Sequence, residues 1–406
     1  MTLKADIIIL GGGFAGLTLA IALDRYDITS IVIDTAPPVH TLKKDFDGRT
    51  TAIASACWKL LQAIGLGNSL EGKGCPIQIV RVSDQLKMPD LRFESSKEDG
   101  PSGYMLENRY LKQALNEAAQ AAQNITLLRP AHAIETERNN EGVSVTLADG
   151  QKITASLLVG AEGRASPTRK EAGINLAHWE YNHVAVICTL FHEKPHQHIA
   201  HEIFYPKGPI ALLPMQDEEG RHRSALVWTV PRREADAVKK LSERPFLAEV
   251  SRLTGDVLGT LDFASKPMAY PLSFQYTAKI TDIRLALIAD AAHGIHPIAG
   301  QGLNLGLRDV AALTEILVEG RRLGLDLGDS ALLSRYERWR SLDNLTVAAV
   351  TDSLVHLFAI PGRTASFFRR TGLNVVRYLP FVKKMFLSEA RGDRGKLPRL
   401  LTGKSL

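Results

Sequence analysis

The stretch that decides the fold reads IIILGGGFAG over residues 7–16. Four apolar residues typical of a buried strand come first, and a glycine turn follows where a helical pattern begins. In this G-x-G-x-x-G arrangement Gly11 permits a tight turn, Gly13 lets a pyrophosphate approach the backbone, and Gly16 allows close packing of helix on strand. The stretch therefore predicts a dinucleotide site at a helix N-terminus.

The flanking residues complete a β-α-β unit. We expect a strand at 6–10, a helix at 15–24 and a second strand at 30–33 that ends at Asp34. From the end of that strand, Asp34 can accept hydrogen bonds from an adenosine ribose. Residues 5–23 are nearly uncharged, but Asp6 and the glycine fingerprint favour this unit over a membrane anchor or signal peptide.

A second glycine loop, almost 300 residues further along, indicates which dinucleotide binds. Residues 285–288 predict a strand, Asp290 follows it, and HPIAGQGLN at 296–304 leads into a helix that begins near Asn304. The backbone amides of such a loop can contact the pyrimidine end of an isoalloxazine ring, and the helix dipole would stabilise reduced flavin. Together the two loops predict one flavin dinucleotide held at both ends.

Between the loops the sequence pattern changes from α/β to β-rich. Helices are expected at 52–64, 108–122 and 245–258, with strands at 125–128, 143–147 and 157–159. Short apolar runs separated by turn residues predict further strands at 77–82, 184–191, 203–205, 210–213 and 225–230. The fold class expected is α/β, with a Rossmann-like dinucleotide domain, an inserted β-rich substrate domain and a helical C-terminal region.

We therefore expect four segments. A dinucleotide-binding domain covers 1–175, of which about 76–102 contribute to the substrate domain, and the β-rich substrate domain covers 176–275. Residues 276–330 return to the first domain, and 331–406 form a helical, basic C-terminal region. A chain of 406 residues with 45% hydrophobic and 23% charged residues is consistent with about two globular domains.

The cysteines and histidines do not predict a metal or disulfide site. Cys57, Cys75 and Cys188 are widely separated and form no CxxC pair, which fits a reducing, cytoplasmic compartment. Six histidines lie between His178 and His201, but in a polar, turn-rich stretch without convergent carboxylates. We expect no metal.

The net charge of +5 is unevenly distributed. Residues 363–406 carry eleven basic and two acidic side chains, interleaved with apolar residues such as Phe367 and Phe368. A basic segment with an apolar face can lie on an anionic membrane, although a helix packed on the protein body would show the same pattern. No nucleic-acid-binding module accompanies the charge, so nucleic acid is not an expected partner.

The run HPIAGQGLNLGLRD at 296–309 closely resembles the signature of the ubiquinone-biosynthesis hydroxylases, a branch of the single-component flavoprotein aromatic hydroxylases. The resemblance covers nearly the whole chain, including DGRTTA at 47–52, NRYL at 108–111 and RRTGL at 369–373. Two positions depart from the family pattern. Glu162 stands where Asp is usual, and Ala289 stands where Gly is common before Asp290.

The resemblance implies a Rossmann-like FAD-binding domain of the aromatic-hydroxylase type and a set of FAD-binding residues. Arg49 and Arg109 would lie near the pyrophosphate and flavin, Asp290 would contact the ribityl-phosphate region, and Pro297, Gly300, Gln301, Gly302 and Asn304 would line the ring. The implied cofactor-binding residues are Gly11, Gly13, Phe14, Ala15, Gly16, Asp34, Arg49, Arg109, Asp290, Pro297, Gly300, Gln301, Gly302, Leu303 and Asn304.

The resemblance also implies the chemistry. FAD, reduced by NAD(P)H or a ferredoxin-type donor, would react with O2 as co-substrate, and the flavin C4a-hydroperoxide would hydroxylate an electron-rich ring. No side chain is assigned as a general base, because the flavin itself is the reagent. The substrate would be a polyprenylated phenol or quinol on the ubiquinone pathway. The protein would be cytoplasmic and peripherally associated with the inner membrane through its C-terminal region, possible partners being other ubiquinone-biosynthesis proteins.

Alternatives remain open at this stage. The chain could hydroxylate a soluble aromatic, reduce isoprenoid double bonds, or act as a non-catalytic flavin-binding assembly subunit. The Gly-Trp-x-Trp-x-Ile-Pro signature of flavin-dependent halogenases is missing, since the four tryptophans are scattered. A disulfide oxidoreductase is disfavoured because the cysteines form no redox pair.

Overall fold

The computed structural model describes residues 2–37, 46–86, 90–96, 98–294, 301–341, 387–388, 391–393 and 395–406. A six-stranded sheet lies at the centre of the dinucleotide-binding part, in the order β20-β21-β13-β2-β3-β9, and β21 to β9 pair in parallel. Its strands are β2 (Ile7–Leu10), β3 (Ser30–Ile33), β9 (Ile125–Leu128), β13 (Leu157–Gly160), β20 (Thr281–Asp282) and β21 (Leu285–Leu287). Since Ile7, Ile8 and Ile9 have no exposed surface, β2 is a core strand and not an anchor.

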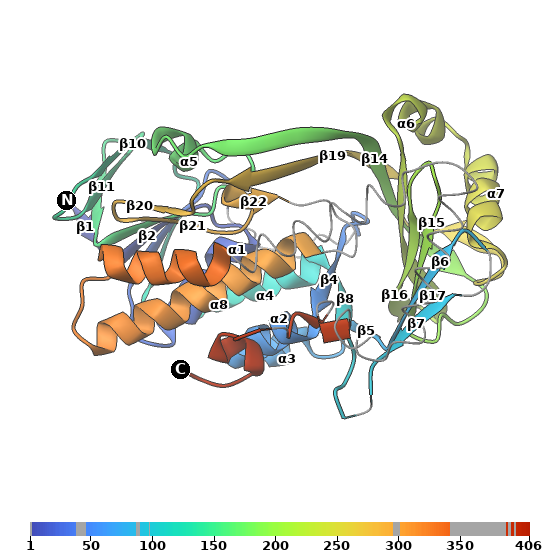
Figure 1. Cartoon of the computed structure of the whole chain (residues 1–406), viewed down its shortest axis with the longest axis horizontal. Coiled ribbons are helices and arrows are strands. Elements are labelled where there is room, and N and C mark those ends of the chain that lie inside the picture. Colours follow the sequence, from blue (N-terminus) through green and yellow to red (C-terminus); the bar gives the residue numbers. More distant parts are fainter. Residues whose placement is uncertain are drawn as a thin grey trace.

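Helices cover one face of this sheet and a second sheet lies beyond the other (Figure 1). The main helices are α1 (Phe14–Asp24), α4 (Asn108–Ala121) and α8 (Gln301–Arg322). The four-stranded sheet is made of β1 (Leu3–Lys4), β12 (Lys152–Ala155), β11 (Val143–Leu147) and β10 (Ala133–Arg138). Short helices are α2 (Ser55–Leu61), a π-helix (Gln62–Leu66), α3 (Gly67–Leu70), α5 (Pro167–Glu171) and the 3-10 turn η2 (Ala289–Ala291).

A nine-stranded sheet forms the other half of the molecule. Its long strands β14 and β19 run from the dinucleotide-binding part into this half (Figure 1). The strands are β6 (Ile79–Asp84), β7 (Leu91–Glu94), β14 (Leu176–His192), β15 (Ile199–Phe204), β16 (Ile210–Glu218), β17 (Arg221–Pro231), β18 (Leu261–Phe263), β19 (Met268–Thr277) and β22 (His293–Gly294). Helices α6 (Arg232–Lys239) and α7 (Glu243–Thr254) accompany it.

A three-stranded sheet, β4-β8-β5, connects the two halves, and here one expectation was wrong. Its strands are β4 (Thr50–Ala54), β5 (Cys75–Ile77) and β8 (Gly103–Glu107). The helix expected at 52–64 begins only at Ser55, because residues up to Ala54 pair with β8. Pairing with a strand about fifty residues away overrides the local helical pattern.

The described end of the chain packs on the dinucleotide-binding part. Residues 330–341 are helical, and the 3-10 helix η4 (Arg399–Thr402) buries Leu400 and Leu401 against the main core. Arg391 is also buried and donates hydrogen bonds to the carbonyl oxygens of Asp99 and Gly100. Most of the basic segment expected to meet a membrane, residues 363–386, lies outside the described residues.

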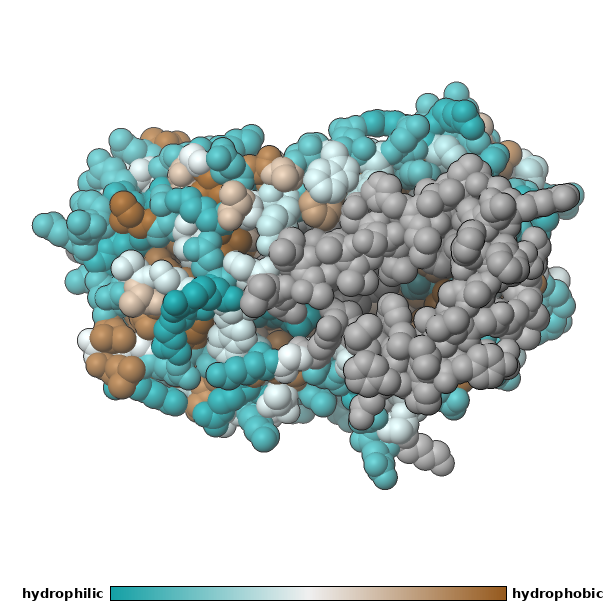
Figure 2. All heavy atoms as spheres, viewed as in Figure 1, coloured by the Kyte–Doolittle hydropathy of each residue, from teal (hydrophilic) through white to brown (hydrophobic). Residues whose placement is uncertain are grey.

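Two surface observations bear on the membrane question. None of the helices in the described ranges is long and apolar enough to cross a bilayer. In Figure 2 the coloured surface is mostly hydrophilic, with hydrophobic residues scattered among polar ones. Neither observation concerns residues 363–386, so membrane association of the C-terminal region stays a prediction.

Candidate functional site

The first glycine loop has the geometry that a phosphate-binding turn needs. Gly11 has a φ of +102°, and a side chain there would overlap the backbone of Ala161. Gly16 lies so close to the carbonyl oxygen of Gly11 that no Cβ fits. By contrast, an ideal Cβ on Gly13 would have no atom within 4 Å. The loop is therefore closed against the protein at two glycines and open to a ligand at the third.

The open side of this loop faces a cavity of about 570 Å³ lined by Gly11, Gly13 and Asp34. Asp34 directly follows β3, and its carboxylate accepts hydrogen bonds from the backbone amides of Gly12 (2.6 Å) and Ala36 (2.7 Å). The carboxylate thus fixes the glycine turn, and its contact with a ribose stays a prediction. Phe14 and Ala15 form the first turn of α1 behind the loop.

Arg129 supports the same loop and was not singled out from the sequence. Its guanidinium donates hydrogen bonds to the carbonyl oxygen of Gly12 (2.7 Å) and to Oδ1 of Asn116 (2.7 Å). Burial lowers the pKa of Arg129, whereas the charge of Asp34 raises it. A cation beneath the glycine turn suits an anionic ligand such as a pyrophosphate.

The unusual Glu162 is held by its own segment. Its carboxylate accepts hydrogen bonds from the hydroxyls of Ser166 (2.6 Å) and Thr168 (2.7 Å). Glu162 also lines the cavity at the glycine loop. The longer side chain therefore places its charge toward α5, where two hydroxyls satisfy it.

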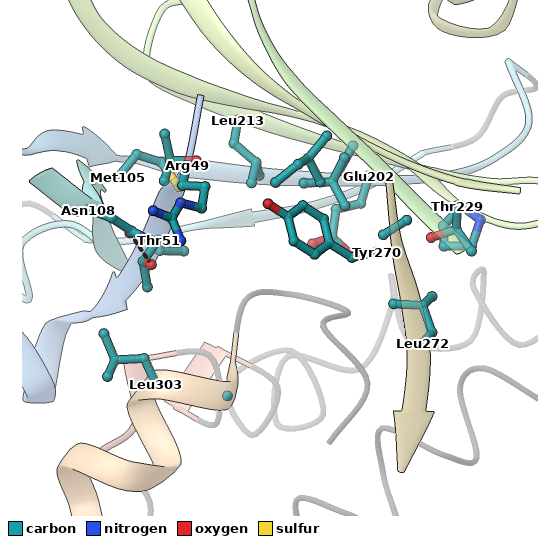
Figure 3. A pocket seen from close by; sticks show the side chains of 18 of the residues that line it. Arg49, Thr51, Met105, Asn108, Glu202, Leu213, Thr229, Tyr270, Leu272 and Leu303 are labelled. Atoms are coloured by element: carbon teal, nitrogen blue, oxygen red, sulfur yellow. Dashed lines mark hydrogen bonds between the residues drawn. The ribbon is translucent and has the colours of Figure 1, made fainter. Parts of the chain in front are cut away.

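A second cavity, of about 400 Å³, lies between the two halves of the molecule. Arg49, Thr51 and Leu303 line it from the dinucleotide-binding side, and the nine-stranded sheet forms the opposite wall (Figure 3). The sheet contributes mainly apolar side chains: Ala185, Ile187, Phe204, Ala211, Leu213, Val227 and Leu272. Such a wall suits an aromatic or lipid-like ligand and excludes water.

Three charged groups from the dinucleotide-binding part line this second cavity. Arg49 forms two hydrogen bonds with Asp47 (2.8 and 2.6 Å), which raise the pKa of the guanidinium. The Asp290 carboxylate follows β21 as expected and lies 3.5 Å from Nε of Arg164. Arg49, Arg164 and Asp290 all line the cavity. Arg164 was not predicted to belong to the site, because no motif marks it.

Two of the other expected residues, Arg109 and Asn304, take positions that the sequence pattern alone did not define. Arg109 does not line the second cavity; its Nε lies 2.6 Å from a Glu107 carboxylate oxygen and its guanidinium contacts the Tyr110 ring. The Asn304 amide joins α8 to β4 through the backbone of Ala54 (2.8 Å) and Ala52 (2.9 Å). Their contacts with FAD stay predictions.

The second glycine loop is described only in part. Gln301 begins α8, three residues earlier than expected, and Gly302 and Leu303 line the second cavity. Pro297 and Gly300 lie outside the described residues. The start of α8 nevertheless faces the cavity, as a flavin-binding helix N-terminus requires.

Asp309 fixes the segment that carries Asp290. Its buried carboxylate lies 2.6 Å from Nε2 of His293 and 2.7 Å from Nε of Arg340, and it accepts a hydrogen bond from the amide of Ala289 (2.9 Å). Burial alone would raise its pKa, but the charges and hydrogen bonds of His293 and Arg340 lower it to about 2. Ala289 has a φ of +53°, which explains why glycine suits this position.

Among the described residues, one group of potential metal ligands joins β5 to the segment that precedes β15. Cys75, His196 and His198 are close together, but Nε2 of His196 is 3.0 Å from the Met215 carbonyl oxygen and its Nδ1 accepts from the His198 amide. Burial also raises the pKa of Cys75 to about 12, which disfavours the thiolate. We assign no metal to this group.

The fold and the two cavities define a class of protein: a two-part dinucleotide-binding enzyme with an apolar substrate chamber. The comparisons identify the family. The family described as "FAD binding domain" matches residues 4–349. Ubiquinone hydroxylase UbiL of Rhodospirillum rubrum is 43% identical over 99% of this chain and 94% of its own. The 3-demethoxyubiquinol 3-hydroxylase of Escherichia coli is 30% identical over 95% of this chain and 98% of its own.

Solved structures show the same fold. The p-nitrophenol 4-monooxygenase PnpA from Pseudomonas putida has a TM-score of 0.77 at 16% identity, covering 98% of this chain and 100% of that chain. PqsL of P. aeruginosa in complex with 2-aminobenzoylacetate has a TM-score of 0.76 at 21% identity, covering 90% of this chain and 100% of that chain. The chain belongs to the FAD-binding family of ubiquinone hydroxylases and is an FAD-dependent monooxygenase. FAD as cofactor and the aromatic-hydroxylase fold are thereby confirmed.

Proposed function

We propose that this monooxygenase hydroxylates the ring of a polyprenylated phenol or quinol in ubiquinone biosynthesis. The observation that carries the proposal is the second cavity, which combines an apolar sheet wall with the start of α8. Relatives named ubiquinone hydroxylases, at 43% and 28% identity, favour this substrate class over a soluble aromatic. The bound substrate would place its ring against the nine-stranded sheet.

In this proposal the two cavities hold the two ends of one FAD. Gly11, Gly13 and Asp34 would hold the adenosine and phosphates, while Asp290 and the start of α8 would hold the ribityl and ring end. Three features fit FAD: the open side of Gly13, the Arg129 guanidinium at the glycine loop, and the apolar walls of the second cavity. Bound FAD supplies the activated oxygen, and the apolar walls keep water from it.

The proposal assigns a task to each part of the chain. Residues 1–175 and 276–330 would bind FAD, and residues 176–275, with about 76–102, would supply the substrate wall. Electrons would come from NAD(P)H or a ferredoxin-type donor. The sheet topology supports the assignment of the substrate wall, because β6, β7 and β14 to β19 belong to the nine-stranded sheet that lines the second cavity.

We further propose that residues 363–386 hold the protein on an anionic membrane, where a polyprenylated substrate resides. Arg391 does not contribute, because its side chain is buried against Asp99. The test is co-sedimentation of the whole protein with vesicles of anionic or neutral lipid. Binding to anionic vesicles that falls with salt and with a Lys383→Glu, Lys384→Glu variant supports the proposal. Equal binding to both vesicle types contradicts it.

The substrate class is tested by profiling quinone intermediates by mass spectrometry in cells that lack the protein. The expected result is accumulation of a polyprenylated phenol or quinol one oxygen short of the next intermediate. The wild-type chain and an exposed-site control, Glu249→Gln, should restore the profile, whereas Gly13→Glu should not. An unchanged quinone pool would contradict the proposal and favour a soluble aromatic substrate or an assembly role.

A further inference from the structure

Glu202 interrupts an apolar row of side chains in the wall of the second cavity. The strand register places Glu202 of β15 opposite Ala211 of β16, Ala211 opposite Val227 of β17, and Val227 opposite Ile187 of β14. All four side chains line the cavity. Because side chains alternate along a strand, His201 and Ile203 line a different, small cavity instead. The sequence thus places one carboxyl group within an otherwise apolar row.

The Glu202 carboxyl group has no partner among the described residues, neither a hydrogen bond nor an ion pair. Glu107, at the end of β8, shows the usual alternative: its carboxylate lies 2.9 Å from Arg223 and 2.6 Å from Arg109. A carboxyl group without a partner in an apolar wall is costly and is free to bind a polar group of a ligand that enters the cavity. Figure 3 shows Glu202 on the sheet side of the cavity, across from Leu303.

The surroundings suit proton transfer at neutral pH. Burial raises the pKa of Glu202 to about 7, and no charged neighbour contributes to the shift. The other titratable or charged groups that line the cavity are Arg49, Arg164, Asp290 and Tyr270. The Asp290 carboxylate lies 3.5 Å from Nε of Arg164 and so has a cationic partner. Among the described carboxyl groups that line the cavity, Glu202 is the one with no such cation beside it.

We propose that Glu202 is a catalytic residue that accepts the proton of the substrate's ring hydroxyl, an inference that rests on the proposed function. The O–H bond breaks, its electron pair stays on the ring oxygen, and the proton moves to the Glu202 carboxylate. The resulting phenolate directs electron density to the neighbouring ring carbon that receives oxygen. As aromaticity returns, the ring carbon loses its own proton to water, and the ring oxygen takes its proton back from Glu202, which becomes a carboxylate again. Reductant and O2 are those of the monooxygenase reaction.

The test compares Glu202→Gln with the wild-type holoenzyme, using a geranyl-substituted phenol and measuring the hydroxylated product. Glutamine keeps the shape but cannot take the proton, so kcat should fall by about 100-fold or more while KM changes little. In the wild type kcat should rise with pH through a group near neutrality, and this rise should be absent from Glu202→Gln. Glu202→Asp should retain the pH dependence at a lower rate. The control is Glu249→Gln on α7, an exposed pair with Arg252 that lies away from the cavity.

The outcomes separate this inference from the proposed function. Wild-type kcat and an unchanged pH profile in Glu202→Gln, with FAD still bound, would overturn the role of Glu202 while leaving the hydroxylase intact. A wild-type holoenzyme that hydroxylates no prenylated phenol would overturn the proposed function and this inference with it. Should Glu202→Gln fail to retain FAD, the pH profile of Glu202→Asp decides, and loss of its neutral rise in kcat would count against the proposal.

Discussion

Two glycines of one loop are expected to fail for different reasons when each is changed to alanine. Gly11 has a φ of +102°, and its added Cβ would lie 2.6 Å from the carbonyl carbon of Ala161 and 2.9 Å from the amide nitrogen of Glu162. The left-handed backbone alone costs about 1–3 kcal/mol, and neighbouring backbone atoms cannot move aside. We therefore expect Gly11→Ala to destabilise the apoprotein by about 3 kcal/mol or more, a large part of a typical stability of about 5–15 kcal/mol.

Gly13→Ala should leave the apoprotein almost unchanged. Its backbone angles, a φ of −75° and a ψ of −169°, suit alanine, and no atom lies within 4 Å of the added Cβ. Stability should change by less than about 1 kcal/mol. The methyl group would instead occupy the side from which the pyrophosphate approaches, so FAD affinity should fall by about 100-fold, or about 3 kcal/mol. Gly13→Glu should fold but retain no FAD.

The assays are urea unfolding of the apoproteins, followed by circular dichroism, and FAD titration followed by flavin fluorescence. Gly11→Ala should show a stability defect, and Gly13→Ala should show a pure binding defect. An apoprotein of Gly11→Ala as stable as the wild type, or a yellow, fully FAD-loaded Gly13→Glu protein, would refute these expectations.

Three further changes test the electrostatics and packing of the site. Asp309→Asn should cost about 3–5 kcal/mol, because the buried Arg340 guanidinium loses its carboxylate and His293 loses its hydrogen-bond partner. Since the pKa of Asp309 is lowered from 3.8 to about 2, the wild type should lose this stabilisation as pH falls from about 4 to about 2, as measured by acid unfolding. Gly306→Ala should cost about 1–3 kcal/mol, because its Cβ would lie 2.6 Å from that of Ala289, and adding Ala289→Gly should restore most of the loss in a double-mutant cycle of urea unfolding. Glu202→Gln should raise the stability of the apoprotein by roughly 2–3 kcal/mol above pH 7 and by little at pH 5. The reason is that the raised pKa of Glu202 makes the wild type lose stability as pH rises from 4.5 through about 7. Equal melting temperatures of both proteins at pH 8 would contradict this.

The parts of the fold that depend on neighbouring residues were predictable from the sequence. The strands at 30–33, 125–128 and 143–147 have the expected bounds, and the helix after the first glycine loop begins one residue early. Each is defined by a local apolar period and a turn signal at its end. The strands β10, β12 and β19 were not predicted, because partner strands stabilise them more than their own pattern does.

The candidate site was predictable where it follows strand ends and unpredictable where it depends on register. Asp34 and Asp290 come directly after buried strands, so their place at the sheet edge could be inferred. Glu202 was missed, because the direction in which its side chain faces depends on the register between four strands, β14 to β17, which the sequence pattern does not define. Arg129 was missed because its contact with Gly12 joins residues more than a hundred positions apart. A charged residue within a predicted apolar strand was the available signal for Glu202.

Oxygen transfer to a substrate ring is the central claim, and isotopically labelled oxygen gas tests it most directly. Purified FAD-loaded protein is supplied with NAD(P)H or a ferredoxin-type donor, a geranyl-substituted phenol and the labelled gas, and the product is analysed by mass spectrometry. We predict a hydroxylated ring that carries a single labelled oxygen atom. Oxygen consumption that yields only hydrogen peroxide, or a product without label, would contradict the account.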